Sequence, residues 1–150
     1  MRAQLVLTHE NTDFDGLASQ LAAWKLYPQA RPVLPRRPNR NLRDFLTLYW
    51  DELPYVRYED LPRRMEVERI ILVDTQTPVT PKGMSDDTVV QIIDHHPLGR
   101  DLPPNWSYMG EEVGATVTLL LERIIADGLC LTPVEATLLA LGIYEDTGSL

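Results

Sequence analysis

The sequence is poor in cysteine and has no long apolar runs. Its single cysteine, Cys130, excludes an internal disulfide framework. No run without a charged residue is longer than nine residues, which excludes a bilayer-spanning helix. The opening MRAQLVLTH has too short an apolar stretch for a signal peptide. We therefore expect a single cytoplasmic globular domain of 150 residues that has no membrane partner.

Positive charge is also scarce: the chain has 14 Lys and Arg against 22 Asp and Glu, which gives a formal charge of −8. This excess argues against a general nucleic-acid coat protein or a protein that binds anionic membranes. It allows a phosphorylated substrate, since bound cations reverse the local field. Neither G-x-G-x-x-G nor a Walker loop occurs, which argues against a dinucleotide site or a P-loop ATP site.

Strand-like and helix-like segments alternate along the chain, which predicts an α/β domain with a mainly parallel sheet flanked by helices. The β-branched runs at 69–73 and 88–93 are typical of strands covered on both faces. Further strands are expected over 5–8, 30–34, 55–58 and 106–109, and helices over 16–27, 41–50, 115–126 and 133–144.

Local signals refine these elements. Asn41 is expected to cap the helix that follows it, and Thr132 with Glu135 forms a capping-box pattern. Cys130 is expected to be a buried, inert thiol. The helical spacing of the larger aromatic residues predicts core positions for Trp24, Phe45, Tyr49 and Trp50.

Acidic and imidazole side chains gather at the ends of predicted strands and at the end of the last helix. Ligands of parallel sheets bind beyond the carboxyl ends of the strands. His9, Asp13 and Asp15 share parity and could line one wall of an extended loop, although Asp15 alone could be a helix cap. The full set is His9, Asp13, Asp15, Asp74, Asp94, His95, His96 and Asp146. Each motif alone is weak, and the ordered combination is what indicates a site.

So many carboxylates in one place would repel one another unless cations neutralised them. Carboxylates mixed with imidazoles suit Mn²⁺ or Mg²⁺, with Zn²⁺ or Co²⁺ less favoured. The groups exceed what one ion needs, so two ions about 4 Å apart that share one carboxylate are the simplest arrangement. Such a pair activates water and holds both oxygens of an in-line displacement at phosphorus.

These motifs resemble those of the DHH phosphoesterase family. The family signature corresponds to Asp94-His95-His96, the first motif to HENTDFDG at 9–16, the second to Val73-Asp74 and the fourth to GIYEDTGS at 142–149. The segments NTDFD at 11–15 and RPNRN at 37–41 are most similar to the DHH module of multidomain bacterial proteins. In those proteins the module is fused to CBS pairs and a poly(A)-polymerase-like tRNA nucleotidyltransferase.

The resemblance implies roles for individual residues. One ion would be held by His9, Asp13 and Asp74, and the other by Asp15, Asp74, His95 and Asp146, which makes Asp74 the bridge. His96 would face the substrate phosphate, and Asp94 would orient a histidine. The segment Gly114-Ala115-Thr116 resembles a family segment near the substrate, where its N–H groups could receive a phosphate. An ordinary helix cap explains this segment equally well.

Four arginines, Arg36, Arg37, Arg40 and Arg43, form a local basic patch. They could contact a phosphate chain, with Arg37 as the predicted substrate ligand, although a solvated loop is the favoured explanation. The family resemblance also implies a C-terminal domain of the DHHA1 type that contributes to the substrate cleft. Residues 1–150 are therefore expected to be a fragment that carries the metal centre.

The expected function is Mn²⁺- or Mg²⁺-dependent hydrolysis of a phosphoester in a phosphorylated nucleotide or short single-stranded nucleic acid. Two alternatives stay open at this point. One is a nucleotide-sensing or regulatory module that binds its ligand without turnover, and the other is a structural module with a vestigial site. An exposed apolar last helix could also promote a homodimer.

Overall fold

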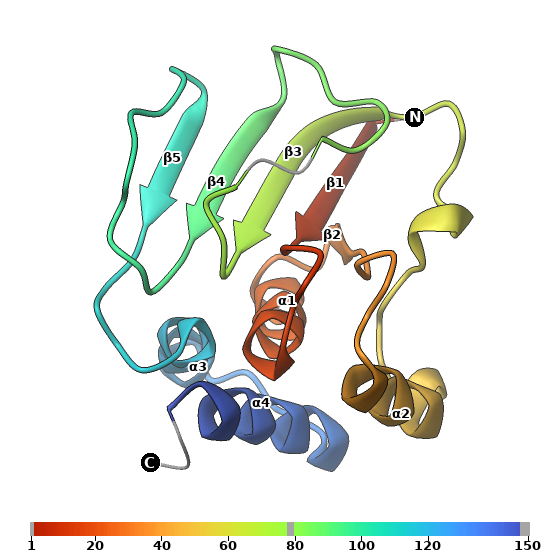
Figure 1. Ribbon diagram of the computed structural model, residues 1–150, viewed down its shortest axis with the longest axis vertical. Helices are drawn as coiled ribbons and strands as arrows, with labels where there is room; N and C mark the ends of the chain where they lie inside the picture. The colour runs from red at the N-terminus through yellow and green to blue at the C-terminus, as the bar shows by residue number, and fades with distance from the viewer. Residues whose placement is uncertain (1, 78–79, 148–150) are drawn as a thin grey trace.

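The computed structural model describes residues 2–77 and 80–147. Within them, a parallel sheet of five strands lies at the centre, in the order β2-β1-β3-β4-β5 (Figure 1). The strands are β1 (Arg2–Leu7), β2 (Ala30–Pro32), β3 (Glu66–Val73), β4 (Val89–Ile93) and β5 (Trp106–Met109). The α-helices of the described residues are α1 (Phe14–Leu26), α2 (Arg40–Tyr49), α3 (Thr116–Ala126) and α4 (Pro133–Asp146). The predicted α/β class with a parallel sheet is confirmed.

The two faces of the sheet are covered by different kinds of structure. Val6, Ile71 and Ile93 pack with the α-helices, which gather on one side of the sheet (Figure 1). Ile70 and Ile92 point to the other face, which is covered by loop residues and the short 3-10 helix η2 (Tyr58–Asp60). The strands are thus buried on both faces, as their uninterrupted apolar sequences predict.

Strand order and register decide where a ligand can reach the sheet. The chain leaves β1 for β2 on one side and returns to β3 on the other, so the switch point of the topology lies between β1 and β3. Leu7 pairs with Leu72, and Val73 pairs with Ile93. The carboxyl ends of β1, β3 and β4 are therefore level, and the residues that follow them meet at one edge.

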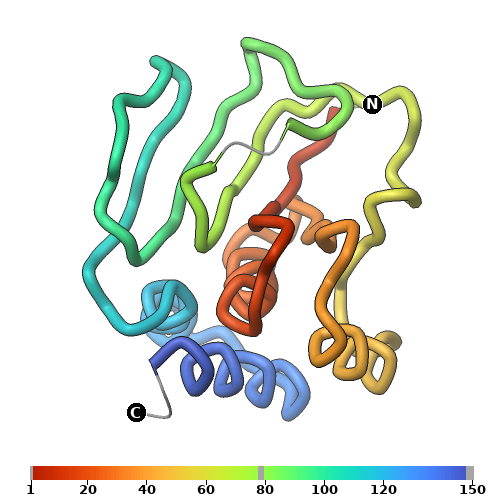
Figure 2. Tube along the Cα trace, viewed as in Figure 1, coloured from red at the N-terminus to blue at the C-terminus, as the bar shows by residue number. Residues whose placement is uncertain are grey.

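Helices α1 and α4 lie side by side (Figure 2). A Cβ on Gly142 would lie 2.8 Å from the Cβ of Ala18, so only glycine permits this approach. At the start of α4, the capping box of Thr132 and Glu135 is present as predicted. Lys25 and Glu135 form an ion pair of 3.1 Å between the end of α1 and the start of α4. This packing fixes α4, whose last residue is Asp146.

Several local predictions are wrong. Helix α2 begins one residue earlier than expected, because the side chain of Asn39, not that of Asn41, accepts a hydrogen bond from Leu42 N at 2.9 Å. The segment 55–58 forms only a single bridge, between Val56 and Val33, rather than a strand.

Cys130 is exposed, because it lies in the turn between α3 and α4 and its apolar neighbours do not cover it. Of the predicted core aromatics, Phe45 is buried, and Trp24, Tyr49 and Trp50 are partly buried against the core. In the part of the chain that the structure describes, no helix is long and apolar enough to span a membrane.

Candidate metal centre

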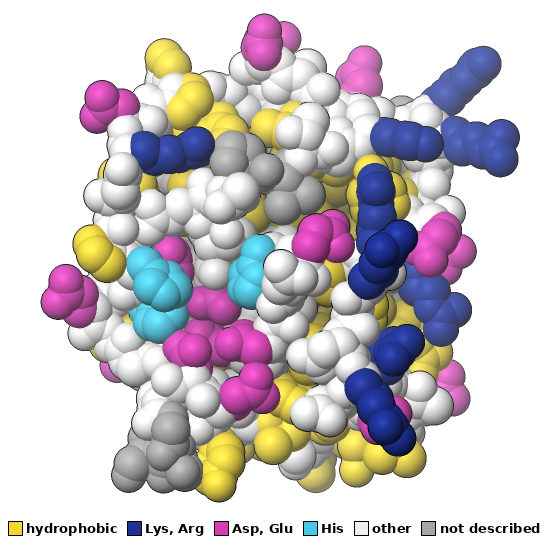
Figure 3. All heavy atoms as spheres, in the orientation of Figure 1, with side chains coloured by type: hydrophobic (Ala, Val, Ile, Leu, Met, Phe, Trp, Pro, Cys, Tyr) yellow, Lys and Arg dark blue, Asp and Glu magenta, His cyan; other side chains and the backbone are white. Residues whose placement is uncertain are grey.

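The predicted acidic and histidine residues meet at the carboxyl edge of the sheet. His9 follows β1, Asp74 follows β3 and Asp94 follows β4, while the remaining residues come from helix ends and the adjoining loop. Figure 3 shows histidine and acidic side chains side by side on this face of the molecule. Three groups have ligand atoms within 4.8 Å of one another: His9 with Asp13 and Asp74; Asp15 with His95 and Asp146; and Asp74 with Asp94, His95 and His96.

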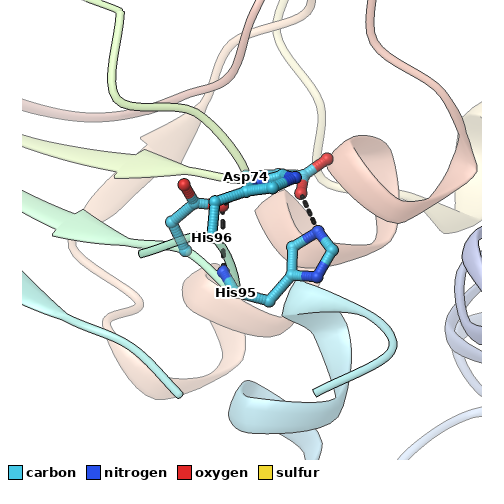
Figure 4. A group of neighbouring side chains, drawn as sticks. Asp74, His95 and His96 are labelled. Atoms are coloured by element: carbon cyan, nitrogen blue, oxygen red, sulfur yellow. Dashed lines mark hydrogen bonds and ion pairs between the residues drawn. The ribbon is translucent and has the colours of Figure 1, made fainter. Parts of the chain in front are cut away.

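Asp74 belongs to the first of these groups and also lies beside His95 of the second. Its backbone adopts φ of 60°, a left-handed conformation that aspartate tolerates better than most residues, and its N–H donates to Ile93 O at 3.0 Å. The buried carboxylate has Oδ2 at 3.6 Å from His9 Nε2. Its Oδ1 lies 3.4 Å from His95 Nε2 (Figure 4). One carboxylate therefore presents a different oxygen to each group.

We call His9 and Asp13 the outer group. Asp13 is the N-cap of α1, and its Oδ1 accepts a hydrogen bond from Gly16 N at 3.1 Å. The capping role considered for Asp15 is therefore filled by Asp13. The His9 side chain is 33% exposed, and its hydrogen-bonding contact with Asp74 raises the pKa of the imidazole above its usual value. Both residues of the outer group come from the short loop between β1 and α1.

We call Asp15, His95 and Asp146 the inner group. Asp15 has no exposed surface, and its carboxylate accepts hydrogen bonds from Val117 N at 2.9 Å and Thr116 N at 3.0 Å, both at the start of α3. Burial, followed by the charge of Asp74, raises the pKa of Asp15 to about 9. Asp74 itself is ionised more readily than usual: burial opposes this, but hydrogen bonds from His9 and Thr116 outweigh burial and lower its pKa.

The His95 ring is oriented by a backbone carbonyl. Its Nδ1 lies 3.0 Å from Val113 O, and because a carbonyl only accepts, Nδ1 must carry the proton. In the neutral ring Nε2 is then a lone pair, and it lies 3.2 Å from Asp146 Oδ2 and 3.4 Å from Asp74 Oδ1. A lone pair facing carboxylates is unfavourable unless a cation lies among them, which is the usual arrangement of a metal-binding histidine.

Asp94 and His96 form a separate pair beside this cluster. Asp94 is buried, and its Oδ1 lies 2.8 Å from His96 Nδ1 and also accepts a hydrogen bond from His95 N. The other oxygen, Oδ2, accepts a hydrogen bond from Gln76 Nε2 at 3.1 Å. The His96 side chain is 61% exposed. Asp94 thus orients His96 and leaves its Nε2 free to meet a ligand.

The residues predicted to bind substrate lie in different places relative to the cluster. The N–H of Thr116 is taken by Asp15, and its hydroxyl donates to Asp74 Oδ1 at 2.8 Å. Ala115 is buried beside it, and Gly114 is exposed. Arg37 is exposed in the loop between β2 and α2, and no hydrogen bond or ion pair joins it to the cluster within residues 2–77 and 80–147. The structure therefore brings Thr116 into the cluster and leaves Arg37 apart from it.

Sequence reasoning did not identify two residues that support His96. Gln76 Nε2 donates to Asp94 and also to the carbonyls of His96 and Pro97, and the Tyr108 hydroxyl donates to the same His96 carbonyl. The only signal for Gln76 was its position two residues after Asp74, which is too common to be informative. Residues 148–149 of the predicted fourth motif lie outside the described residues.

The donor set fits a hard divalent cation. Imidazole nitrogen and carboxylate oxygen together, without thiolate, are typical of Mn²⁺ and Mg²⁺ sites. Burial first, and then the charge of Asp74, raises the pKa of Asp15, and a bound cation would oppose both effects. A cluster of this kind at the switch point of a parallel sheet is a credible metal centre.

Comparisons with known proteins agree with this geometry. Two A-adding tRNA nucleotidyltransferases, from Geobacter sulfurreducens and Aquifex aeolicus, are each 36% identical to the chain over 97% of its length. The chain spans only 17% of the length of either enzyme. A Streptococcus agalactiae protein described as a probable manganese-dependent inorganic pyrophosphatase is 28% identical over 95% of the chain, which spans 48% of that protein.

A similar fold occurs in a solved structure from Methanococcus jannaschii, described as a putative family II inorganic pyrophosphatase. It superposes with a TM-score of 0.71 at 26% identity, covering 99% of this chain and 49% of that one. The family described as DHH family, N-terminal domain, matches residues 4–143. With its signature residues at the carboxyl edge of this sheet, the chain belongs to the DHH family.

Proposed function

We propose that the cluster holds two Mn²⁺ or Mg²⁺ ions and that the chain hydrolyses a phosphoester of a nucleotide or short oligonucleotide. The observation that carries this proposal is the position of Asp74, whose two oxygens face His9 and His95 on opposite sides. One carboxylate shared between two groups of ligands is the arrangement expected of a bridged pair of cations.

Residues of the chain divide the work of such a site. His9, Asp13 and Asp74 would hold one ion, and Asp15, His95 and Asp146 would hold the other with the second oxygen of Asp74. When bound, the ions supply positive charge and an activated water for attack at phosphorus. Because Nδ1 of His96 faces the Asp94 carboxylate and carries a proton, the ring would act in its doubly protonated form and donate Nε2–H in a hydrogen bond to a phosphoryl oxygen, which would stabilise the charge that develops there.

The choice between substrates draws on the relatives. Pyrophosphatases appear among them, and so do enzymes whose name refers to tRNA. Both act on phosphorylated compounds, which supports phosphoryl chemistry in general. The similarity to the tRNA nucleotidyltransferases is the greater, at 36% against 28% identity, and this favours a nucleotide or oligonucleotide over inorganic pyrophosphate.

A ligand-sensing module is the second candidate. The chain spans 17% of the length of the A-adding enzymes, so in those proteins the matching region is a minor part beside the named activity. Such a module would bind a phosphorylated ligand and release it unchanged. The presence of both His96 and its partner Asp94 favours hydrolysis, because binding alone does not need an oriented proton donor.

The test is a hydrolysis assay with Mn²⁺ on a short adenylate, an adenosine 3′,5′-bisphosphate and inorganic pyrophosphate. Asp74→Asn serves as the inactive variant, and Asp86→Asn, which removes an exposed carboxylate far along the β3–β4 loop, as the matched control. We expect Mn²⁺-dependent product from a nucleotide substrate in the wild type and in Asp86→Asn only. Ligand-induced thermal stabilisation without any product would instead establish the sensing module.

A further inference from the structure

The arginines of residues 36–64 are unusual in this acidic chain. Seven of its 14 basic residues lie there, and the stretch 36–43 holds four arginines and no acid. In the described residues, the ion pairs that Lys and Arg make with carboxylates are those of Arg2 with Glu68 and Lys25 with Glu135. Figure 3 shows Lys and Arg side chains along one side of the face that carries the histidines. Residues 36–64 also hold five acidic residues, so their formal charge is +2, and the positive charge is concentrated in the stretch 36–43.

A groove lies among these arginines, between α2 and the segments before and after it. Its volume is about 460 Å³, and its lining includes Leu34, Pro38, Arg43, Leu46, Trp50 and Arg57. The Arg57 guanidinium lies 4.6 Å from the centre of the Trp50 ring, and the Arg36 guanidinium lies 4.3 Å from the centre of the Tyr58 ring. Two guanidinium groups are therefore held on aromatic rings, where they offer both charge and a flat surface.

Arg36 lies between the groove and the loop that carries His9. The Glu10 carboxylate, next to His9, accepts a hydrogen bond from Arg36 N at 3.1 Å. A smaller cavity lined by Thr8, Glu10 and Arg36 lies at this junction. Leu34 lines both this cavity and the groove. Leu34 and Arg36 therefore lie between the loop that carries His9 and the groove.

We propose that this groove binds a single-stranded nucleic acid whose terminal nucleotide is held at the metal centre. The inference rests on the proposed function and deepens it, because it assigns the surface that would hold the rest of an oligonucleotide. Phosphates would pair with Arg43 and Arg57, and a base would stack on the Arg57 guanidinium, which lies over the Trp50 ring. Pyrophosphate is too short to use the groove, and an acidic peptide would use its charge but not its stacking surface.

The test measures binding of a fluorescein-labelled hexa-adenylate with phosphorothioate linkages, which resist hydrolysis, by fluorescence anisotropy in Mn²⁺ at several salt concentrations. The variant Arg43→Ala/Arg57→Ala is compared with Arg63→Ala/Arg64→Ala, which removes the same charge from exposed arginines outside the groove. We expect roughly tenfold weaker binding in the groove variant alone, because the substitutions remove stacking as well as phosphate pairing. The slope of log affinity against log salt should fall by about 0.7 for each phosphate that is no longer paired with an arginine.

Three results would overturn the proposal that the groove binds the strand. They are no binding by the wild type, equally weakened binding in the two double variants, or displacement of the oligonucleotide by an equal concentration of oligoglutamate. A further variant, Trp50→Leu, keeps every charge and should still weaken binding. Thermal shift with Mn²⁺ alone, run on the same proteins, tests the proposed function separately. A wild type without an Mn²⁺ shift that still binds the oligonucleotide through Arg43 and Arg57 would overturn the metal centre and retain the groove.

Discussion

The inner and outer groups contain similar ligands in very different surroundings. Asp15 of the inner group is fully buried and accepts hydrogen bonds from two amides of α3 and from the Ser19 hydroxyl. The outer group comes from a single loop, and His9 is one-third exposed. Asp15 and His95 of the inner group are therefore held in place by tertiary contacts, although Asp146 is exposed, while the outer group depends on local chain conformation. We expect the inner group to bind its cation more tightly, since fewer of its side chains must be ordered on binding.

The largest effect is expected from a change at Asp74, the residue that the inner and outer groups share. Asp74→Asn takes away the charge that both groups share but retains an oxygen that can accept the Thr116 hydroxyl. We expect loss of both Mn²⁺ ions and of hydrolysis, measured by thermal shift with Mn²⁺ and by product release. Asp86→Asn should behave like the wild type. Full activity in Asp74→Asn would refute the bridged pair.

His96→Ala should leave both groups intact and affect only the reaction. The side chain is largely exposed; its Nδ1 meets Asp94, and its ring packs against that of His95 with 4.0 Å between the ring centres. We expect Mn²⁺ stabilisation to be unchanged and kcat to fall by about 10²–10³, the usual cost of removing one charge-stabilising donor. Leu98→Ala, a change to an exposed neighbour, is the control. Loss of Mn²⁺ binding in His96→Ala would mean that His96 is a ligand.

The two groups can be separated by His9→Ala. The change removes an outer ligand and touches none of the hydrogen bonds that hold Asp15. We expect His9→Ala to lose the outer ion and retain the inner one, and Asp146→Asn to weaken binding of the inner ion. Metal content after gel filtration measures both. Loss of both ions in His9→Ala would mean that the inner group cannot bind its ion without the outer one, which would contradict the distinction between the two groups.

A further expected effect is on the stability of the metal-free protein. Because the pKa of Asp15 is raised from 3.8 to about 9, folding binds a proton across that range, and the metal-free protein should lose stability as the pH rises through it. The raised pKa of His9 acts in the same direction. Urea unfolding in chelator should show this decline, and Mn²⁺ or Asp15→Asn should reduce it. Stability that rises with pH over this range would contradict the assigned burial of Asp15.

The parts of the site that could be predicted from the sequence are those whose position follows directly from the end of a strand. His9, Asp74 and Asp94 follow strands whose apolar runs are clear, so parallel pairing alone brings them to one edge. The amides of α3 that hold Asp15 were not predictable, because they lie about a hundred positions along the chain and reach Asp15 only through helix packing. Gln76 was missed for the same reason, since its partners belong to the loop after β4.

Errors in the fold also have physical causes. Asn39 and Asn41 flank a single residue, and composition does not decide which of them caps α2. Cys130 was placed in the core because leucines flank it, yet the turn between α3 and α4 leaves it exposed. A run of apolar residues indicates burial only where a regular element gives it a face, and this turn has none.

The central claim is that Asp74 joins two cations. The most direct measurement counts the Mn²⁺ ions bound to each chain by native mass spectrometry, in the wild type and in Asp74→Asn. The account predicts two ions per wild-type chain and none in the variant. One ion in both proteins, or an unchanged count in Asp74→Asn, would contradict it.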